Sequence, residues 1–238
     1  MRYAVLSDIH SNWEALECAL AYLKKHKVHD FWVLGDTIGY GANPNECFAW
    51  AVQNSHVNLL GNHEKSVVDP SILEEFTEEA RIADEWTARV LRPEFRKRIE
   101  QLPYVHIVTS ATLVHGSPHE PHKFHYLLSA RDAWPAFHAF ETALCFVGHT
   151  HVPSLFRESA ERVQYLTPGV YEIERNEHCI LNPGSIGQPR DGDKRLSFGI
   201  FDDKAWTFEI VRLEYENEEA ARKIREAGLP RALADKLL

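Results

Sequence analysis

The sequence lacks the features that mark several large classes of protein. No apolar run reaches the roughly 18 residues of a membrane-spanning helix, and no signal-peptide pattern precedes the first predicted strand. There are only 4 cysteines and none has C-x-x-C spacing, which is typical of reduced cysteines in a cytoplasmic protein. The net charge of −9 argues against the broad basic face of a protein dedicated to duplex nucleic acid. We therefore predict a cytoplasmic protein that binds neither membranes nor duplex nucleic acid, and its acidic balance still permits a small phosphate-bearing substrate.

What is present is typical of one globular domain. The 238 residues are 44% apolar and 11% aromatic, which suffices for a sizeable core, and we find neither an internal repeat nor a low-complexity linker. We predict a single domain over 1–238, with a helical insertion at 65–101 and a helical tail at 217–238 that is interrupted near Gly228 and Pro230. The predicted strands lie at 2–7, 31–35, 57–60, 104–109, 111–115 and 143–148 and in short runs over 153–213, and further helices lie near 12–26, 44–54 and 129–141.

Five apolar runs each end in a residue suited to hold a metal ion. Such runs, three of which are closed by glycine, indicate buried strands, and the functional groups of α/β proteins follow the carboxyl ends of their strands. We therefore expect these five strand ends to form one metal cluster. The residues that follow the five runs are Asp8-Ile9-His10, Asp36, Asn62-His63, His115 and His149-Thr150-His151.

Spacing predicts how some of these side chains act together. If the segments are extended, residues i and i+2 face the same way, so Asp8 and His10 can bind one ion together, as can His149 and His151.

The remaining positions suggest separate roles. Asp36 has two oxygens and can bridge two ions, whereas Asn62 offers a neutral amide oxygen. His63 follows Asn62 directly and is expected to point elsewhere, toward a substrate.

The five blocks SDIH, GDTIGYG, GNHE, VHGSP and GHTH, in this order, resemble the calcineurin-like metallophosphoesterase superfamily, whose pattern is D-x-H, G-D, G-N-H, H and G-H-x-H. The phrases SDIHSNWEAL, GDTIGYGANPNEC and NPGSIGQPRDGD are similar to its small prokaryotic phosphodiesterase-like branch. The resemblance implies an α/β (α+β) sandwich of two mixed β-sheets flanked by helices, with metals at the strand carboxyl ends. It also implies two ligand sets: Asp8, His10, Asp36 and His151 for one ion, and Asp36, Asn62, His115 and His149 for the other.

This ligand chemistry predicts two divalent transition-metal ions. Carboxylate, amide and imidazole ligands without thiolate suit Mn, Fe, Co, Ni or Zn, and Mn is favoured. Two ions about 3.5–4 Å apart acidify a bridging water and neutralise charge in an in-line displacement. Because a metal-bound water can have a pKa of roughly 7, hydroxide is available at neutral pH, and His63 is left to assist the leaving group.

The predicted function is therefore metal-dependent hydrolysis of phosphoesters, with a phosphodiester in a small or nucleotide-like substrate favoured. The alternatives are a protein serine/threonine phosphatase, a phosphomonoesterase, or a non-catalytic binding protein on the same fold. A scaffold does not need His63, so this residue favours catalysis. The sequence leaves open the natural substrate, the physiological metal and whether the chain forms a homo-oligomer.

Residues outside the metal set are predicted to contact substrate: Asn12, Tyr40 and Arg190. Asn12 or Ser11 could also cap the first helix, and Arg190 could instead pair with Asp191 or Asp193 in its own turn.

Two segments have several interpretations. His119, His122 and His125 could form a solvated loop, face the substrate or bind a third metal. The insertion at 65–101 could simply pack on the sheet, or serve as a lid or dimer contact.

Overall fold

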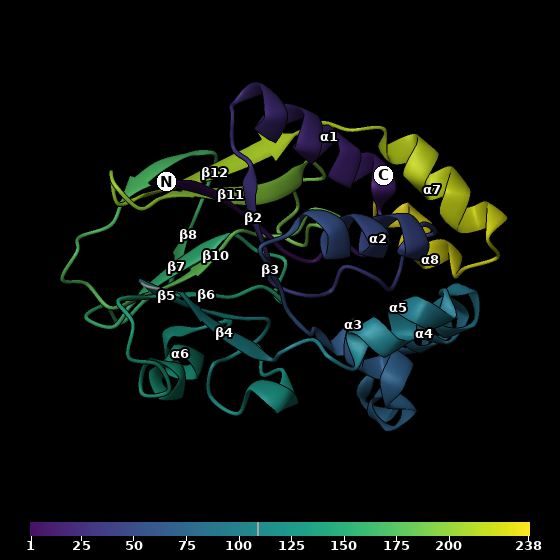
Figure 1. Cartoon of the computed structure of the whole chain (residues 1–238), viewed down its shortest axis with the longest axis horizontal. Helices are drawn as coiled ribbons and strands as arrows, with labels where there is room; N and C mark the ends of the chain where they lie inside the picture. The colour runs from purple at the N-terminus through teal and green to yellow at the C-terminus, as the bar shows by residue number, and fades with distance from the viewer. Residues whose placement is uncertain (109) are drawn as a thin grey trace.

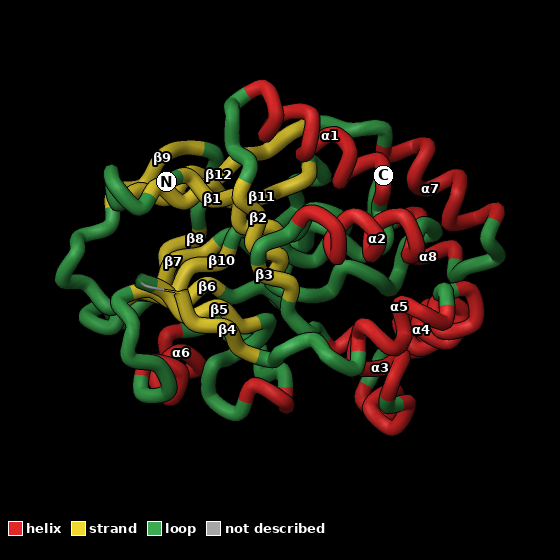
Figure 2. The backbone as a smooth tube through the Cα atoms, in the orientation of Figure 1, coloured by secondary structure: helices red, strands yellow, loops and turns green. Residues whose placement is uncertain are grey.

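The computed structural model describes residues 1–108 and 110–238 (Figure 1). In these residues, two six-stranded mixed sheets face each other and helices flank them, so the predicted fold class is confirmed (Figure 2). The strands are β1 Arg2–Leu6, β2 Asp30–Val33, β3 Val57–Asn58, β4 Val105–Val108, β5 Ala111–Val114, β6 Leu144–Phe146, β7 Ser154–Arg157, β8 Gln164–Tyr165, β9 Gly169–Glu172, β10 Cys179–Asn182, β11 Leu196–Asp202 and β12 Thr207–Leu213. The α-helices are α1 Trp13–Lys25, α2 Pro44–Asn54, α3 Asn62–Val68, α4 Glu78–Val90, α5 Pro93–Ile99, α6 Ala130–Phe137, α7 Asn217–Glu226 and α8 Arg231–Asp235, with 3-10 turns η1 Pro70–Glu75 and η2 Pro121–Lys123.

Each sheet contains three neighbouring parallel strands. The first sheet has the order β3-β2-β1-β11-β12-β9, in which β1, β2 and β3 are parallel. The second has the order β4-β5-β6-β10-β7-β8, in which β5, β6 and β10 are parallel. Since the loops after parallel strands leave the same edge of a sheet, each sheet delivers three loops to one place.

The central strands are buried on both faces because each sheet lies between two layers. Val5 and Phe201 point into the core between the sheets, whereas their neighbours Ala4 and Ile200 pack outward against α1 and α2. On the second sheet, α6 covers the outer face through Phe137 and its neighbours. Alternation along a strand thus supplies apolar side chains to both layers. Each large apolar side chain that is fully buried contributes about 1.5–3 kcal/mol to the stability of the fold.

One predicted strand ends earlier than expected. The strand at 57–60 is only Val57–Asn58, and Asn62 and His63 lie in the first turn of α3 rather than at a strand end. Gly61 is the N-cap residue, and the carboxylate of Glu64 three residues later accepts the Gly61 N–H at 3.0 Å. This contact is the glutamate half of a capping box, and it begins the helix at the GNHE sequence.

The C-terminal tail forms the predicted helix pair, α7 and α8, separated around Gly228 and Pro230. The pair packs through Ile224 and Leu233 against Ala83 of α4.

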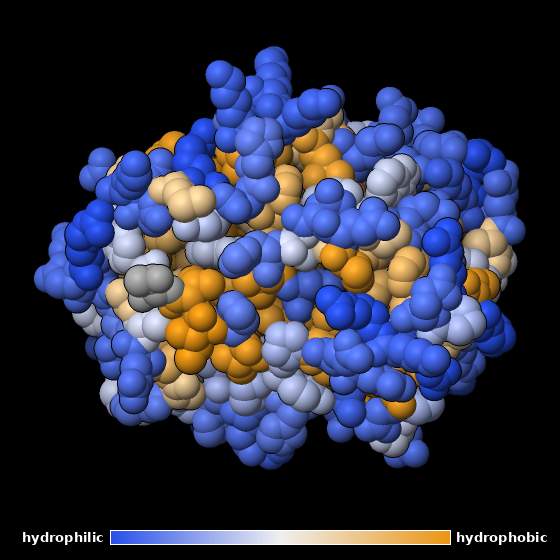
Figure 3. Space-filling view, in the orientation of Figure 1, coloured by the Kyte–Doolittle hydropathy of each residue, from blue (hydrophilic) through white to orange (hydrophobic). Residues whose placement is uncertain are grey.

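Among the described residues, no helix has both the length and the apolar character needed to cross a membrane. The face shown in Figure 3 is largely hydrophilic, with an apolar area over its strand-rich half. Ile107 on the edge strand β4 is 67% exposed.

Candidate metal centre

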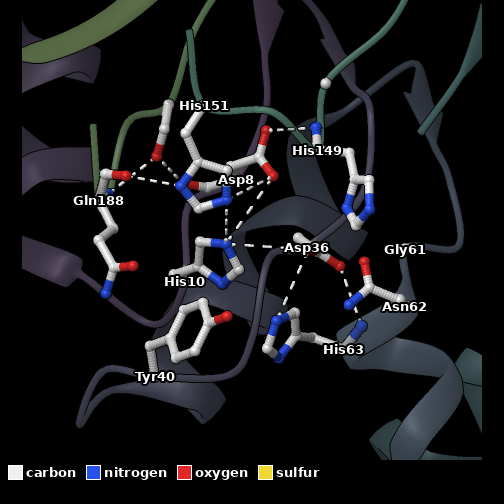
Figure 4. A network of polar contacts seen from close by, with 12 residues as sticks. Asp8, His10, Asp36, Tyr40, Gly61, Asn62, His63, His149, His151 and Gln188 are labelled. Carbon is white, nitrogen blue, oxygen red and sulfur yellow. Dashed lines mark hydrogen bonds and ion pairs between the residues drawn. The ribbon is translucent and has the colours of Figure 1, made fainter. Parts of the chain in front are cut away.

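All seven predicted ligands lie together at the edge where the parallel strands of the two sheets end. Figure 4 shows six of them, all except His115. Those of the first sheet follow β1, β2 and β3, and those of the second follow β5 and β6. In the order of these five strands they are Asp8 and His10, Asp36, Asn62, His115, and His149 and His151.

One group consists of Asp8, His10 and His151, whose ligand atoms lie within 4.8 Å of one another. The Nε2 atoms of His10 and His151 are 3.1 Å apart, and Asp8 Oδ1 lies 3.2 Å from His151 Nε2. The other carboxylate oxygen, Asp8 Oδ2, accepts the backbone N–H of His149 at 3.0 Å. Oδ1 is buried and has no hydrogen-bond donor among the described residues, so it is free to bind a cation.

A second group consists of Asp36, His115 and His149. His115 Nε2 lies 3.1 Å from Asp36 Oδ2 and 3.2 Å from Asn62 Oδ1, which brings Asn62 into the same group. The same Asp36 oxygen is 3.8 Å from His10 Nε2, so Asp36 lies between the two groups.

Backbone carbonyls fix the orientation of three of the histidines. Because a carbonyl oxygen can only accept, the Nδ1–H group must be the donor, and the lone pair of Nε2 then faces the cluster. Converging lone pairs repel one another unless a proton or a cation lies between them. The three contacts are His10 Nδ1 to Ile38 O at 3.1 Å, His115 Nδ1 to Leu34 O at 2.9 Å, and His151 Nδ1 to Gln188 O at 2.6 Å.

Protonation alone does not account for the first group. Burial lowers the pKa of the His10 imidazole, and so do His63 and His151; burial also lowers the pKa of His151. The facing Nε2 atoms of His10 and His151 thus disfavour a proton between them, and this donor set fits a divalent cation.

The carboxylates are held in the ionised state despite their burial. Burial opposes ionisation of Asp8, but His151 lowers its pKa overall. Burial also opposes ionisation of Asp36, but His115 and, to a lesser extent, His63 lower its pKa overall. In return, Asp36 outweighs burial at His115 and raises the pKa of its imidazole to about 9. The site thus supplies two anionic carboxylates to any cation that enters it.

The local backbone differs from the extended geometry that we predicted for the ligand pairs. Left-handed residues turn the chain sharply after β1, β2 and β6, so the i, i+2 rule does not apply there, and His149 and His151 enter different groups rather than one. The residues with positive φ are Asp8 (53°), His10 (48°), Asp36 (51°), His149 (65°) and His151 (62°).

Glycines before the ligands are required by close packing. A Cβ at Gly61 would clash with the Asp36 carboxylate, and a Cβ at Gly148 would lie 2.8 Å from Asp8 Oδ2.

His63 is held by a carboxylate that the sequence patterns did not reveal. Its Nδ1–H donates to Asp84 Oδ1 at 2.7 Å, and Asp84 Oδ2 accepts from the Ser66 hydroxyl at 2.6 Å. Burial alone would lower the pKa of His63, but Asp84 and then Asp36 raise it. The free Nε2 lies 3.9 Å from Asp36 Oδ2, so this imidazole borders the cluster.

Glu64 is a second residue that sequence reasoning missed as part of the site. Its buried carboxylate accepts the N–H groups of Asp36 at 2.8 Å and Thr37 at 2.7 Å, as well as those of Ile38 and Gly61. Burial and then the charge of Asp36 raise the pKa of Glu64 to about 7. Glu64 therefore joins the loop after β2 to the start of α3. The capping-box spacing of GNHE was the signal that could have revealed it.

A cleft of about 870 Å³ opens beside the cluster and is lined by Asn62, His63 and His149. Residues from η1 and the start of α4 contribute one part of its lining, and residues 122–126 contribute another. The Phe76 ring lies 5.1 Å from the His63 ring, and Tyr126 stacks on His149 with centroids 3.8 Å apart. Aromatic rings thus flank His63 and the predicted ligand His149.

Tyr40 and Arg190 both line this cleft. Arg190 Nη2 donates to the Tyr40 hydroxyl at 3.3 Å, and the Tyr40 ring lies 4.5 Å from that of His63. The alternative pairing within the turn is not found, because Asp191 pairs with Arg212 and Asp193 pairs with Arg195.

Asn12 has a structural role in this fold. Its Oδ1 accepts the Ala15 N–H at 3.1 Å and so caps α1, while Nδ2 donates to Gly187 O and the Tyr215 hydroxyl. Both N–H groups of the amide are therefore used within the protein, so its predicted substrate contact is not part of the proposed mechanism.

The histidine-rich loop borders the cleft. His122 and His125 line it, whereas the exposed His119 stacks on His125 with ring centroids 6.4 Å apart. Within residues 1–108 and 110–238, the groups arranged to hold a metal do not include these three histidines, so no third metal is proposed.

The family follows from comparison with known proteins. The model of the calcineurin-like phosphoesterase superfamily domain matches residues 1–205. The chain is 36% identical over 241 residues to uncharacterized protein MJ0912 of Methanocaldococcus jannaschii, covering 98% of this chain and 96% of that protein. A crystal structure of a metallophosphoesterase from Sphaerobacter thermophilus matches with 38% identity and a TM-score of 0.90, covering 100% and 98% of the two chains. The hypothetical protein PH1004 from Pyrococcus horikoshii OT3 shares the fold, with 19% identity, a TM-score of 0.81, and 99% and 97% coverage.

The chain therefore belongs to the calcineurin-like phosphoesterase superfamily, and it is a phosphoesterase.

Proposed function

We propose that this phosphoesterase hydrolyses phosphodiesters in small or nucleotide-like substrates with two divalent metal ions, Mn being favoured. The observation that carries the proposal is the position of Asp36, whose Oδ2 lies 3.1 Å from His115 Nε2 and 3.8 Å from His10 Nε2, between the two ligand groups. Asp8, His10 and His151 would hold one ion together with Asp36. The second ion would be held by Asp36 and three further ligands: Asn62, His115 and His149.

When bound, such ions supply positive charge to polarise phosphoryl oxygens and to acidify a water at neutral pH. The protein's own part is to orient the donors. Backbone carbonyls fix the directions of the Nε2 lone pairs of His10, His115 and His151. Backbone N–H groups hold one carboxylate oxygen of Asp36 and one of Asp8.

His63 is the proposed proton donor to the leaving oxygen. Asp84 anchors Nδ1 and favours the imidazolium, which leaves Nε2 available at the cleft. A general acid of this kind accelerates a reaction by typically 10²–10⁴-fold. Asp84 itself touches no reacting atom and acts through His63 as a positioning residue.

The cleft supports a nucleotide-like substrate. Its volume of about 870 Å³ lies within the roughly 300–1,000 Å³ of small-molecule sites. Phe76 beside His63 and Tyr126 on His149 offer ring faces to a base or another planar group. Arg190, held by Tyr40, is placed to contact a phosphoryl oxygen.

The runner-up functions fit less well. A protein phosphatase needs room for an extended peptide, whereas the cleft beside the ligands here is bordered by η1 and residues 122–126. A binding protein without catalysis needs neither His63 nor the buried Asp84 that holds it. The unpaired state of all four cysteines supports the cytoplasmic location that we propose.

The test compares wild type and His63→Ala after reconstitution with Mn, using bis(p-nitrophenyl) phosphate, p-nitrophenyl phosphate and alkyl-linked dinucleotides. We expect the diester to exceed the monoester in kcat/KM for the wild type. In the variant, metal content should persist, and the rate on alkyl-linked substrates should fall by about 10²–10⁴-fold. The loss on p-nitrophenyl esters should be smaller, because p-nitrophenolate needs little protonation. Absence of turnover with any metal would refute the function, and equal losses on both leaving groups would refute the acid role.

A further inference from the structure

The cleft has the opposite charge balance from the chain as a whole. The protein carries a net charge of −9, yet the cleft is lined by Lys123, Arg190 and Lys236 against one acidic residue, Glu75. A locally cationic cleft concentrates anions even in an acidic protein.

The three cations are not equivalent. The Lys123 ammonium is 2.7 Å from Glu120 Oε1, which neutralises much of its charge, and the Arg190 guanidinium is tied to Tyr40. Within residues 1–108 and 110–238, Lys236 has no ion-pair or side-chain hydrogen-bond partner, although it is exposed at the cleft. Its positive charge is therefore available to a ligand.

The backbone of Lys236 is nevertheless firmly placed. Its carbonyl oxygen accepts the Lys194 ammonium at 2.7 Å, and its N–H donates to Ala232 O at 3.1 Å. The next carbonyl, that of Leu237, accepts from Asn217 Nδ2 at 2.9 Å, which joins α8 to the start of α7. Holding the main chain in this way reduces the entropy lost when the side chain binds a ligand.

The tail that carries Lys236 lies beyond the part of the chain that the superfamily model matches. The superfamily match ends at residue 205, whereas α7 and α8 begin at Asn217. Leu233 and Leu237 of the tail belong to the same apolar cluster as Ala83, the neighbour of Asp84, and Tyr40 packs against that cluster. The tail therefore completes the cleft on the side where Tyr40 and His63 lie.

We propose that Lys236 is a specificity-determining residue that binds a second phosphate of the substrate, distinct from the one undergoing hydrolysis. This inference rests on the proposed function, because the reacting phosphate is assigned to the metal cluster. A cleft of about 870 Å³ extends well beyond what one phosphoryl group fills. With Lys123 paired to Glu120 and Arg190 assigned to the reacting phosphate, Lys236 is the lining cation left for a second phosphate among the described residues. The enzyme should accordingly prefer phosphodiesters that carry a terminal phosphate.

The test uses the Mn-loaded full chain and three dinucleotides: d(TpT), and the same compound with a 5′- or a 3′-terminal phosphate. We expect wild type to hydrolyse at least one phosphorylated form with a higher kcat/KM than d(TpT). Lys236→Gln should reduce that ratio of kcat/KM values by about 5–20-fold. This is the effect expected from losing one charged hydrogen bond that is weakened by exposure to solvent. Its kcat/KM for d(TpT) should change less than about twofold. Lys236→Arg should keep the preference, and Lys97→Gln, an equal charge change on exposed α5, should leave all three rates unchanged.

A binding measurement separates this proposal from the proposed function. Calorimetry would compare thymidine 3′,5′-bisphosphate with thymidine 5′-monophosphate on wild type and Lys236→Gln. We expect wild type to bind the bisphosphate more tightly than the monophosphate, and Lys236→Gln to bind the two with similar affinity. The difference in affinity for wild type should shrink with added salt. If no dinucleotide is hydrolysed, the proposed function fails while binding still decides the role of Lys236. If Lys236→Gln lost affinity equally for both ligands, or lost affinity for neither, the role of Lys236 would be overturned.

Discussion

Replacing Asp84 by Asn tests whether the buried carboxylate governs the chemistry of His63. The asparagine has the same shape, and its Oδ1 can still accept the His63 Nδ1–H, while its amide can donate to Ser66 Oγ. Ser66 can then direct its own hydroxyl to His63 O, which it already contacts at 2.8 Å. Because every hydrogen bond has a replacement, we expect the free energy of unfolding to change by about 1 kcal/mol or less.

The rate should respond much more strongly than the stability. The carboxylate is the main influence that raises the pKa of His63 against its burial, so its removal reduces the fraction of imidazolium. The loss cannot exceed the whole contribution of the acid, about 10²–10⁴-fold. We expect kcat/KM on alkyl-linked diesters to fall by about 10–10³-fold, and much less on p-nitrophenyl esters.

A double-mutant cycle supplies the decisive measurement. If Asp84 acts only through His63, then Asp84→Asn should have little further effect in the His63→Ala background. Elemental analysis should find the same metal content in all four proteins, and urea unfolding should confirm their stability. Additive losses of rate, or metal lost from the Asp84→Asn protein, would refute the reasoning.

Three further changes test other parts of the structure. Asp36→Asn removes the shared carboxylate, so the Mn-reconstituted protein should fall below the two ions per chain expected of wild type; two retained ions would contradict the bridge. Arg190→Ala should lower kcat/KM by roughly 10–100-fold, as expected for about 1.5–3 kcal/mol of charged hydrogen bonding, with little change in Tm; lost stability with intact kinetics would assign Arg190 to the fold instead. Lys27 has φ of 57° directly after α1, where the Val28 N–H bonds to Leu23 O at 3.0 Å, a geometry that favours glycine. Lys27→Gly should therefore raise the free energy of unfolding by about 0.5–1 kcal/mol and Tm by roughly 2 °C, and a lower Tm in calorimetry would contradict this.

The position of the site could be predicted from sequence because each ligand directly follows an apolar run. The strands that precede Asp8, Asp36 and His115 are buried in the sandwich, and a chain leaving such a strand must emerge at the sheet edge. A residue that directly follows a parallel strand in the sequence can thus be placed at the common edge of the sheet.

The supporting residues could not be predicted in this way. Asp84 reaches His63 from α4, 21 residues further along the chain, and its neighbours form an ordinary amphipathic helix pattern. Lys236 comes from a helix whose place beside the cleft depends on the packing of Leu233 against Ala83. Such contacts are set by tertiary packing, and a single sequence contains no periodicity that marks them.

The backbone after the strands shows why His149 and His151 enter different ligand groups, as the family resemblance implied and the assumption of an extended chain did not. An extended chain would place both rings on one side, but each residue has positive φ, which costs roughly 1–2 kcal/mol for a residue other than glycine. The cost is offset locally, because the His149 N–H bonds to Asp8 Oδ2 and His151 Nδ1 bonds to Gln188 O. The same contacts send one imidazole to each ligand group. Strain at these positions is therefore part of how two neighbouring histidines enter two different ligand groups, and the sequence pattern G-H-x-H records the residues without recording that conformation.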